Sequence, residues 1–383
     1  MTILGNGTGV TGLTPRTVRA LEEAGLEIPD VVRVVRTALD EDFRYGADVT
    51  SAATVAGRTV VADVVAHEAG VVAGLPVALA VFDLLGEYLS SGGSEAGAGG
   101  NAAAPAAREA VAEMMRDTSG PSGGTLYPTS LAEGLQGAGE GGLPGAGAGG
   151  RQAADTALVT DGLQATGTAL VTDGARVVPG DAVLRVSGDA VAVLGAERTV
   201  LNFLTHLSGI ASGTWAWASA VAGTGAVVRD TRKTLPGLRG LEKYAVRCGG
   251  GENHRMGLGD AALVKDNHVA AAGGVAAAVH AVRSAARPGL VIEVECDSVA
   301  QVREALAAGA RFILLDNMPV PVLREAVAVA RAYDGVRLEA SGGLQLGNAR
   351  EVASTGVDYL SVGGLTHSSR ALDLGLDYLG GEG

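Results

Sequence analysis

Residues 291–341 read VIEVECDSVAQVREALAAGARFILLDNMPVPVLREAVAVARAYDGVRLEAS, and this stretch decides the fold. Short apolar segments alternate here with longer segments of helical character; the apolar segments are VIEVE (291–295), RFILLD (311–316) and VRLEAS (336–341). Strands that alternate with helices predict β/α units around a parallel sheet. Each strand also closes on a polar or acidic residue, which is typical of a β/α barrel with functional groups at the carboxyl ends of its strands.

The same rhythm extends on both sides of this stretch. Further strands are expected at AVVRD (226–230), AALVKD (261–266) and VDYLSVGG (357–364). Six strands are fewer than the eight of a complete barrel, so we predict an incomplete β/α (TIM-like) barrel. A single long helix, Gly195 to Val221, is expected to lead into it.

The region before the long helix contains both helices and strands. Helical periodicity covers Pro15 to Leu26 and Pro29 to Glu41, and each proline suits a first helical turn. Residues 59–74 favour β-strands, and residues 75–88 predict an apolar helix. The whole chain is therefore expected to be of the α/β class.

The composition changes sharply after residue 90. Residues 91–150 contain 17 glycines, and such a segment cannot bury enough apolar surface to offset the entropy of ordering it. We predict a flexible Gly/Ala-rich insertion at about 89–165. The heptapeptide TALVTDG occurs at 156–162 and again at 168–174. The second copy runs directly into strand-like sequence, so we expect that copy to belong to the fold.

The bulk composition excludes several classes of protein. A formal net charge of −13 argues against binding to nucleic acid, which requires a broad basic face. The two cysteines give neither a disulfide framework nor a zinc site. No apolar run approaches the length of a membrane span, and the first residues lack an apolar signal segment. We therefore expect a cytoplasmic protein with neither a membrane nor a nucleic-acid partner.

Positive charge is concentrated in one segment of this acidic chain. Residues 229–268 carry eight Lys/Arg and two His, and they include all three lysines of the chain, Lys233, Lys243 and Lys265. Elsewhere the chain uses arginine, whose rigid planar fork makes different contacts from the compact charge of lysine. We interpret this segment as the binding site of a small polyanion.

Charged residues and glycines follow successive strands of the predicted barrel at the same end. They are Arg232, Lys233, Lys265, Glu295, Asp316, Ser341-Gly342-Gly343 and Gly363-Gly364. Glycine turns can cradle phosphate with backbone N–H groups, and two carboxylates beside a phosphate suit Mg²⁺. Together these residues predict a phosphorylated substrate, a second anionic substrate and Mg²⁺. Singly, each could be an ordinary turn, a helix cap or a solvated charge, but their shared position at one end of the strands favours a site.

Several longer motifs resemble one family. They are ERTVLNFLTHLSGIASGT (197–214), RDTRKTLPGLRGLEKYAV (229–246), GGGENHRMGLGDAALVKDNHV (249–269), EVE (293–295), LLDN (314–317), EASGGL (339–344) and TGVDYLSVGGLTHS (355–368). In this order they resemble quinolinate phosphoribosyltransferase, also called nicotinate-nucleotide pyrophosphorylase (carboxylating), from about Val31 to Leu376 without the insertion. That family joins quinolinate to 5-phosphoribosyl 1-pyrophosphate (PRPP). The reaction releases pyrophosphate and CO₂ and forms nicotinate mononucleotide for NAD synthesis.

The resemblance implies a domain organisation. An N-terminal extension and first helix would span 1–26, an N-terminal α/β sandwich domain 27–195, and the incomplete barrel 196–365. Residues 366–383 would pack back on the N-terminal domain. The family forms dimers in which the N-terminal domain of one subunit covers the barrel mouth of the other, so a homodimer is expected.

The resemblance also assigns roles to residues. The residues expected to bind quinolinate are Arg198, from the neighbouring subunit, and Arg232, Lys233, His254, Arg255 and Lys265. The residues expected to face the ribose hydroxyls and Mg²⁺-pyrophosphate of PRPP are Glu295 and Asp316. The residues expected to hold its 5-phosphate are Ser341, Gly342, Gly343, Gly363, Gly364 and His367. Catalytic roles fall to Lys233, Lys265, Glu295 and Asp316.

Three alternatives stay open at this point. A paralogue associated with molybdenum transport would keep the fold and act on another base, although the set Arg198, Arg232, His254 and Arg255 favours a dicarboxylate. A non-catalytic nucleotide sensor would have lost the carboxylates or the lysines, all of which are present. The insertion would impair dimer formation if it lay beside the covered site.

Overall fold

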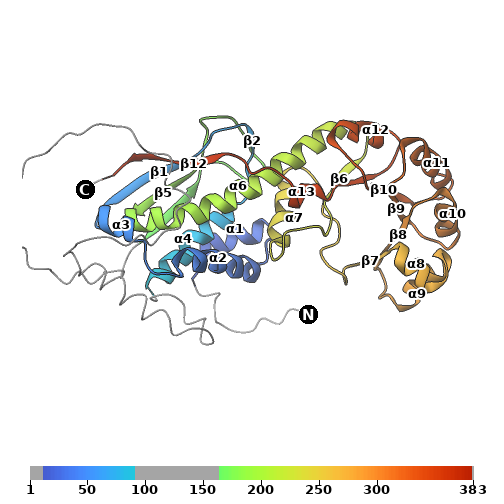
Figure 1. Cartoon of the computed structure of the whole chain (residues 1–383), viewed down its shortest axis with the longest axis horizontal. Coiled ribbons are helices and arrows are strands. Elements are labelled where there is room, and N and C mark those ends of the chain that lie inside the picture. Colours follow the sequence, from blue (N-terminus) through green and yellow to red (C-terminus); the bar gives the residue numbers. More distant parts are fainter. Residues whose placement is uncertain (1–11, 91–163, 382–383) are drawn as a thin grey trace, which may run out of the picture.

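The computed structural model describes residues 12–90 and 164–381, in two parts joined by one long helix (Figure 1). The expected insertion at about 89–165 falls almost wholly outside the described residues, as does the first TALVTDG copy at 156–162. The second copy, at 168–174, lies within the fold, and strand β3 (Ala165–Ala169) contains its first residues.

The N-terminal part is built on an antiparallel four-stranded sheet. The strands in spatial order are β12 (Leu374–Gly380), β1 (Thr59–Ala66), β5 (Ala182–Asp189) and β3. Strand β1 buries Ala62, Val64 and Ala66 at alternate positions, because successive side chains of a strand point to opposite faces of the sheet. A second, two-stranded sheet pairs β2 (Gly70–Val71) with β4 (Arg176–Val177).

Helices complete this part, three of them at the places that the sequence predicts, whereas α3 (Val49–Thr54) was not predicted. They are α1 (Pro15–Glu23), α2 (Ile28–Phe43), α3 (Val49–Thr54) and α4 (Leu75–Ser90). Helix α4 packs against β3, while α1 and α2 pack against α4. Pro15 occupies the first turn of α1, and the Thr14 hydroxyl caps the helix by accepting from the Thr17 amide at 3.3 Å.

One bidentate ion pair joins two neighbouring strands of the main sheet. Arg185 on β5 donates from Nε and Nη2 to the two carboxylate oxygens of Asp63 on β1, both at 2.7 Å. The two residues lie directly opposite each other in the strand register. Hydrogen bonding by Arg185 holds the pKa of the nearly buried Asp63 below its ordinary value.

Helix α6 (Ala190–Val221) runs from the first sheet to the second part of the molecule (Figure 1). It begins five residues before the predicted Gly195, and the Asp189 carboxylate just ahead of it accepts from the Gln164 amide at 2.6 Å. No helix within residues 12–90 or 164–381 combines the length and apolarity needed to cross a bilayer.

The C-terminal part is a parallel six-stranded sheet, which confirms all six predicted strands. In spatial order the strands are β6 (Val227–Arg229), β11 (Tyr359–Ser361), β10 (Arg337–Ser341), β9 (Phe312–Asp316), β8 (Val291–Cys296) and β7 (Ala261–Val264). The first two strands in sequence, β6 and β7, form the two edges. The sheet therefore stays open between them, and only the isolated bridge of Arg229 to Glu252 extends it there.

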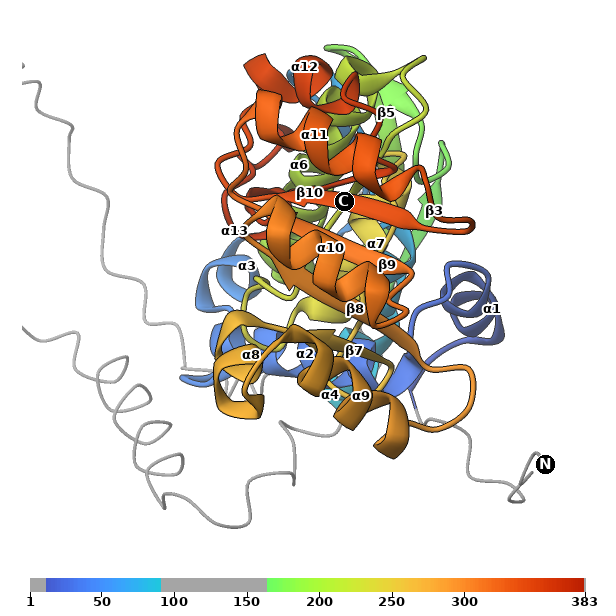
Figure 2. The same ribbon diagram turned by 90° about the vertical axis from the view of Figure 1, so that its right-hand side faces the viewer.

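Helices separate these strands along the chain. They are α7 (Arg239–Cys248), α8 (Asp266–Ala272), α9 (Val275–Ala285), α10 (Val299–Ala307), α11 (Val320–Ala330), α12 (Ala349–Ala353), preceded by the 3₁₀ turn η2 (Leu346–Asn348), and α13 (Gly364–His367). Figure 2 shows α8 to α11 on the outer side of the sheet. The expected α/β architecture with an incomplete β/α barrel is confirmed.

Candidate active site

The carboxyl ends of the parallel strands surround two adjoining cavities. The larger cavity, about 680 Å³, is lined by Thr231, Arg232, Lys233, His254, Arg255, Leu263, Lys265, Glu295, Leu314, Asp316, Asn317, Ser341, Gly342, Gly343 and Ser361. The smaller cavity, about 350 Å³, shares Thr231, Lys233, Ser341, Gly342, Gly343 and Ser361 and adds Gly363, Gly364 and His367, among others. The structure thus brings together every residue predicted for the site except Arg198.

The larger cavity has a strongly basic side. Arg232 and Arg255 both line it, and each is partly buried. Burial, followed by repulsion from Arg232, lowers the pKa of Arg255 from its ordinary value. The Nε atom of Arg232 is buried and has no hydrogen-bond partner within the described protein. Two neighbouring guanidinium groups that repel each other and lack full pairing suit a ligand with paired carboxylates.

Acidic groups line the same cavity at the ends of β8 and β9. Lys265 Nζ donates to Glu295 Oε2 at 2.9 Å, so one predicted lysine and one predicted carboxylate form a partly exposed pair. Asp316 accepts from the side-chain amide of Asn317 at 2.8 Å. These two carboxylates end neighbouring strands and face the same space.

The glycine turn after β10 is one that only glycine can form. Gly342 has φ +80°, a region that residues with a Cβ avoid, and a Cβ there would lie 2.3 Å from Asn317 Oδ1. A Cβ on Gly363, after β11, would lie 2.9 Å from the Lys233 side chain. The chain therefore approaches both Asn317 and Lys233 closely, which leaves backbone exposed around the smaller cavity.

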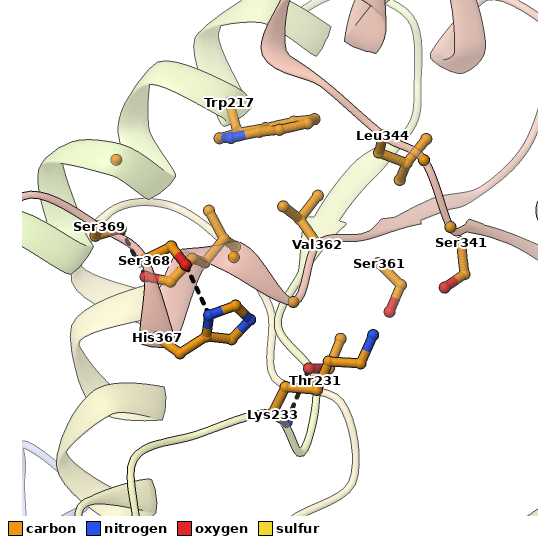
Figure 3. Close-up of a pocket in the computed structure, with 16 residues that line it drawn as sticks. Trp217, Thr231, Lys233, Ser341, Leu344, Ser361, Val362, His367, Ser368 and Ser369 are labelled. Atoms are coloured by element: carbon orange, nitrogen blue, oxygen red, sulfur yellow. Dashed lines mark hydrogen bonds between the residues drawn. The ribbon is translucent and has the colours of Figure 1, made fainter.

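Hydroxyl groups and one lysine converge on the smaller cavity (Figure 3). The Lys233 amine and the hydroxyls of Ser341 and Ser361 point into the same space. His367 lies on the side of Lys233 away from Ser341 and Ser361, and its Nδ1 is 2.7 Å from the Ser368 hydroxyl. An amine, hydroxyls and glycine backbone are the groups that bind phosphate oxygens.

His254 lies deeper than the other predicted residues. It is 8% exposed, and its Nδ1 accepts from the backbone amide of Arg255 at 2.7 Å. Its Nε2 lies 3.0 Å from Glu293 Oε2 and 3.4 Å from Glu339 Oε1. Both ring nitrogens therefore face protein groups, so the structure does not present His254 as a free donor for a ligand carboxylate.

A buried ion pair supports the two loops that carry the cations. Lys243 on α7 donates to Asp230 and, at 2.9 Å, to the backbone carbonyl of His254. Asp230 also accepts from the His254 amide at 2.9 Å and from the Asn253 side chain at 2.5 Å. Since Asp230 directly follows β6 and precedes Arg232, this network fixes the loop after β6 against the loop that carries Arg255.

Comparison with known proteins decides the family. The nicotinate-nucleotide pyrophosphorylase (carboxylating) of Mycobacterium leprae is 44% identical over 347 residues, which cover 90% of this chain and 95% of that protein. The chain belongs to the quinolinate phosphoribosyltransferase family. The C-terminal domain of the family matches residues 210–377, and its N-terminal domain matches residues 145–208.

Other relatives agree with this family. The human nicotinate-nucleotide pyrophosphorylase (carboxylating) is 43% identical over 205 residues, which cover 53% of this chain and 69% of the human protein. The crystal structure of NadC from Streptococcus pyogenes has a TM-score of 0.68 and 32% identity, and the match covers 93% of this chain and 99% of that one. The nicotinate-nucleotide pyrophosphorylase of Francisella tularensis has the same TM-score, 0.68, at 29% identity.

One residue predicted for the site lies away from both cavities. Arg198 is exposed on the N-terminal half of α6, whereas Trp217, near the other end of the same helix, lines the smaller cavity. Gly213 on the same helix also lines this cavity and is nearer, fifteen residues from Arg198 along α6, which corresponds to about 22 Å of helix axis. Arg198 therefore cannot reach the cavities of its own chain in this quinolinate phosphoribosyltransferase family member.

Three acidic residues around the cavities were not predicted for the site: Asp230, Glu293 and Glu339. Arg229 and Lys243 belong to the segment that was predicted to bind a polyanion, but they pair with the buried carboxylates of Glu339 and Asp230 and line neither cavity. Alternation along a strand could have revealed two of the acidic residues, because Glu293 shares a face with Glu295 and Glu339 shares a face with Ser341. Nothing in the local sequence distinguished Lys243, which lies on an amphipathic helix, from an exposed lysine.

Proposed function

We propose that this chain transfers the 5-phosphoribosyl group of PRPP to the ring nitrogen of quinolinate, with loss of pyrophosphate and CO₂, and so forms nicotinate mononucleotide. The main support for the proposal is that the two cavities adjoin and share lining residues. One has paired arginines for a dicarboxylate, the other has glycine backbone and hydroxyls for a phosphate, and Lys233 lines both. A phosphoribosyl donor and a dicarboxylate acceptor can therefore meet at Lys233.

Quinolinate would bind at the basic side of the larger cavity. Its carboxylates stand on adjacent ring carbons, and the adjacent forks of Arg232 and Arg255 suit such a pair. Lys233 and Lys265 lie on the rim and add point charges. Binding of the dianion relieves the repulsion that lowers the pKa of Arg255.

PRPP would span both cavities. Its 5-phosphate would lie against the backbone of Gly342, Gly343 and Gly363, near His367. Its ribose hydroxyls and pyrophosphate would face Glu295 and Asp316. The donor set of these two residues fits Mg²⁺, since the ion takes one or two carboxylates together with substrate phosphates. Glu295 and Asp316 would hold the ion, and when bound it would neutralise charge on the pyrophosphate.

Catalysis requires orientation and the placement of charge rather than a covalent nucleophile. Departure of pyrophosphate leaves positive charge at C1 of the ribose, which the carboxylates of Glu295 and Asp316 stabilise electrostatically. The arginine forks hold the quinolinate nitrogen toward that carbon, which converts an encounter of two molecules into a reaction within one complex. The quaternised ring nitrogen then favours loss of the adjacent carboxylate as CO₂, and the electron pair left on that ring carbon takes up a proton from water. Lys265 or Lys233 stabilises the charge that develops in this last step.

The active enzyme would be a homodimer. Arg198 lies about 22 Å along α6 from Gly213, the nearer of the two α6 residues that line the smaller cavity, so it would contribute to quinolinate binding in a neighbouring subunit. Mixing two inactive variants, Arg198→Ala and Lys265→Ala, tests this arrangement. Shared sites would restore part of the activity in the mixture, whereas sites contained within one subunit would restore none. The two free thiols, Cys248 and Cys296, suit a cytosolic enzyme.

The experiment that tests the function measures nicotinate mononucleotide and CO₂ from quinolinate, PRPP and Mg²⁺, with nicotinate as the alternative acceptor. Activity with quinolinate and none with nicotinate is expected, because nicotinate has only one carboxylate for the paired arginines. If the protein binds PRPP and makes no product from quinolinate, the base it uses is a different one and the proposal is wrong.

A further inference from the structure

The interior of the barrel below the cavities is charged. Glu293 on β8 and Glu339 on β10 are 2% and 0% exposed. Each lies two positions before a residue that lines the larger cavity, Glu295 and Ser341, so both point to the inside of the barrel. Branched apolar side chains normally fill this layer of a β/α barrel. Two buried carboxylates in their place therefore call for a physical reason.

Only one of the two carboxylates has a cationic partner in the barrel wall. Arg229 Nη1 donates to Glu339 Oε2 at 2.7 Å, and its guanidinium lies 4.6 Å from the ring centre of Tyr359. Among the described residues no arginine or lysine forms an ion pair with Glu293, although its charge attracts the Arg255 guanidinium. Its close contact is His254, with 3.0 Å between His254 Nε2 and Glu293 Oε2.

A metal ion is not the reason for this cluster. One ligand atom from each of His254, Glu293 and Glu339 lies within 4.8 Å of the others, which resembles a ligand set. However, the Arg229 guanidinium already donates a hydrogen bond to the Glu339 carboxylate. A cation placed among the three residues would lie beside that fixed positive charge, in an interior where repulsion is weakly screened.

The presence of Glu293 costs stability. Burial, followed by repulsion from Glu293, raises the pKa of Glu339. One oxygen of each carboxylate, Glu293 Oε1 and Glu339 Oε1, has no hydrogen-bond partner among the described residues. A buried polar atom without a partner is unfavourable. A neutral side chain at position 293 would remove one of these atoms and the repulsion, at the loss of the attraction between Glu293 and the Arg255 guanidinium. The unfavourable contacts point to a role of the carboxylate outside folding.

The contacts of His254 show what that role is. Because Nδ1 accepts from the Arg255 amide at 2.7 Å, the proton of a neutral imidazole lies on Nε2, next to Glu293. The carboxylate lies at ion-pair distance from Nε2, so its charge favours the tautomer that the Arg255 amide already selects. That tautomer in turn presents an acceptor to the backbone of Arg255, whose side chain lines the larger cavity. Glu293, His254 and Arg255 thus form a chain of contacts from the barrel interior to the cavity.

We propose that Glu293 is a positioning residue: through His254 it fixes the backbone of Arg255, and so the guanidinium that binds a carboxylate of quinolinate. The proposal rests on the proposed function and extends it to a residue that does not touch the substrate. It makes Glu293 unfavourable for folding and favourable for quinolinate binding, so the two properties should change in opposite directions on substitution. PRPP lies on other residues and should be unaffected.

Two substitutions separate the polar contact with His254 from the charge. Glu293→Gln keeps an oxygen near Nε2 and removes the charge, whereas Glu293→Leu keeps a similar volume and removes both. For Glu293→Leu we expect a melting temperature equal to or above that of the parent protein. We also expect the KM for quinolinate to rise about 10- to 100-fold, the range for loss of one hydrogen bond to a charged group, with the KM for PRPP within about twofold. Glu293→Gln should give an intermediate KM for quinolinate.

Glu339→Gln is the matched comparison. It removes one buried carboxylate of the same kind but takes the partner from Arg229, so its melting temperature should fall. Nitrogen-15 NMR of the imidazoles reports the tautomer directly. The Nε2–H form of His254, identified with a His254→Asn sample, should persist in Glu293→Gln and give way to a mixture of tautomers in Glu293→Leu.

Two results would overturn the proposal. One is an unchanged tautomer and an unchanged KM for quinolinate in Glu293→Leu. The other is a fall in melting temperature with equal increases of both KM values, which indicates a purely structural residue. The NMR and melting measurements need no turnover. A protein inactive toward quinolinate would therefore refute the proposed function, while the tautomer and stability of Glu293→Leu would still decide the link from Glu293 to His254.

Discussion

Replacing Lys243 with methionine should destabilise the protein strongly. The lysine is fully buried and makes two contacts, with the Asp230 carboxylate and the His254 carbonyl. Removing one partner of a buried ion pair costs about 3–5 kcal/mol, because the other charge stays buried without compensation. That range is a large part of the roughly 5–15 kcal/mol by which folded proteins are stable. Methionine has a similar length and volume, so the loss would reflect charge rather than a cavity.

A double-mutant cycle isolates this effect. Asp230→Asn with Lys243→Met removes both charges, and the asparagine oxygen can still accept from the His254 amide. We expect the double variant to recover about 2 kcal/mol relative to Lys243→Met. Urea unfolding followed by tryptophan fluorescence and by circular dichroism measures the free energies, provided that the two probes give coincident transitions.

Two outcomes would refute the reasoning. A loss below about 1 kcal/mol in Lys243→Met would mean that water or a rearranged donor compensates Asp230. Additive single effects in the double variant would mean that the two residues are not energetically coupled. The same variant also tests the link to the site. If the network fixes the loop of His254, the KM for quinolinate should rise in Lys243→Met more than the KM for PRPP.

Three further predictions concern separate parts of the molecule. Gly342→Ala forces a Cβ into a positive-φ position beside Asn317 and should raise the KM for PRPP about 10- to 100-fold. Steady-state kinetics measures this value, and an unchanged KM would contradict binding of the 5-phosphate by the backbone of Gly342. Lys265→Met should lower kcat about 100- to 1,000-fold with pyrophosphate released ahead of CO₂ in single turnovers, and near-normal turnover would exclude a catalytic role. Because Arg185 keeps the pKa of Asp63 below its ordinary value of 3.8, the pair adds stability above that pH and loses it as the pH falls through the lowered pKa. Arg185→Met should therefore flatten the acid side of the stability curve in urea titrations at several pH values, and an unchanged slope would show that the pair adds nothing.

The repeated ends of the strands made most of the site predictable from the sequence. Glu295 and Asp316 each close an apolar strand, and Gly342 and Gly363 follow two others. In a parallel sheet these ends lie at one edge, so position along the chain is enough to place them together. The number of strands likewise indicated an open barrel before any coordinates were known.

The buried charges were not predictable in the same way. Glu293 contacts His254, which lies 39 residues away in the sequence, and Glu339 pairs with Arg229, which lies 110 residues away. Both partners belong to other parts of the fold. Burial of Lys243 depends on Asp230, a residue that local sequence presents as a strand end. The position of His254 was likewise set by these partners, which is why it lines the larger cavity with both ring nitrogens close to protein groups. Propensity and periodicity contain no information about such pairings.

The pairing of β12 with β1 has a consequence for how the chain is made. Strand β12 begins at Leu374, whereas β1, the strand it borders, ends at Ala66. On the ribosome, the first sheet therefore waits with one side of β1 uncovered until the barrel has been synthesised. An uncovered strand edge can pair with another chain. A nascent protein released before residue 374 would therefore expose the edge of β1 that β12 otherwise covers, and this edge could bind other chains. The first sheet is thus completed only after the barrel has been synthesised.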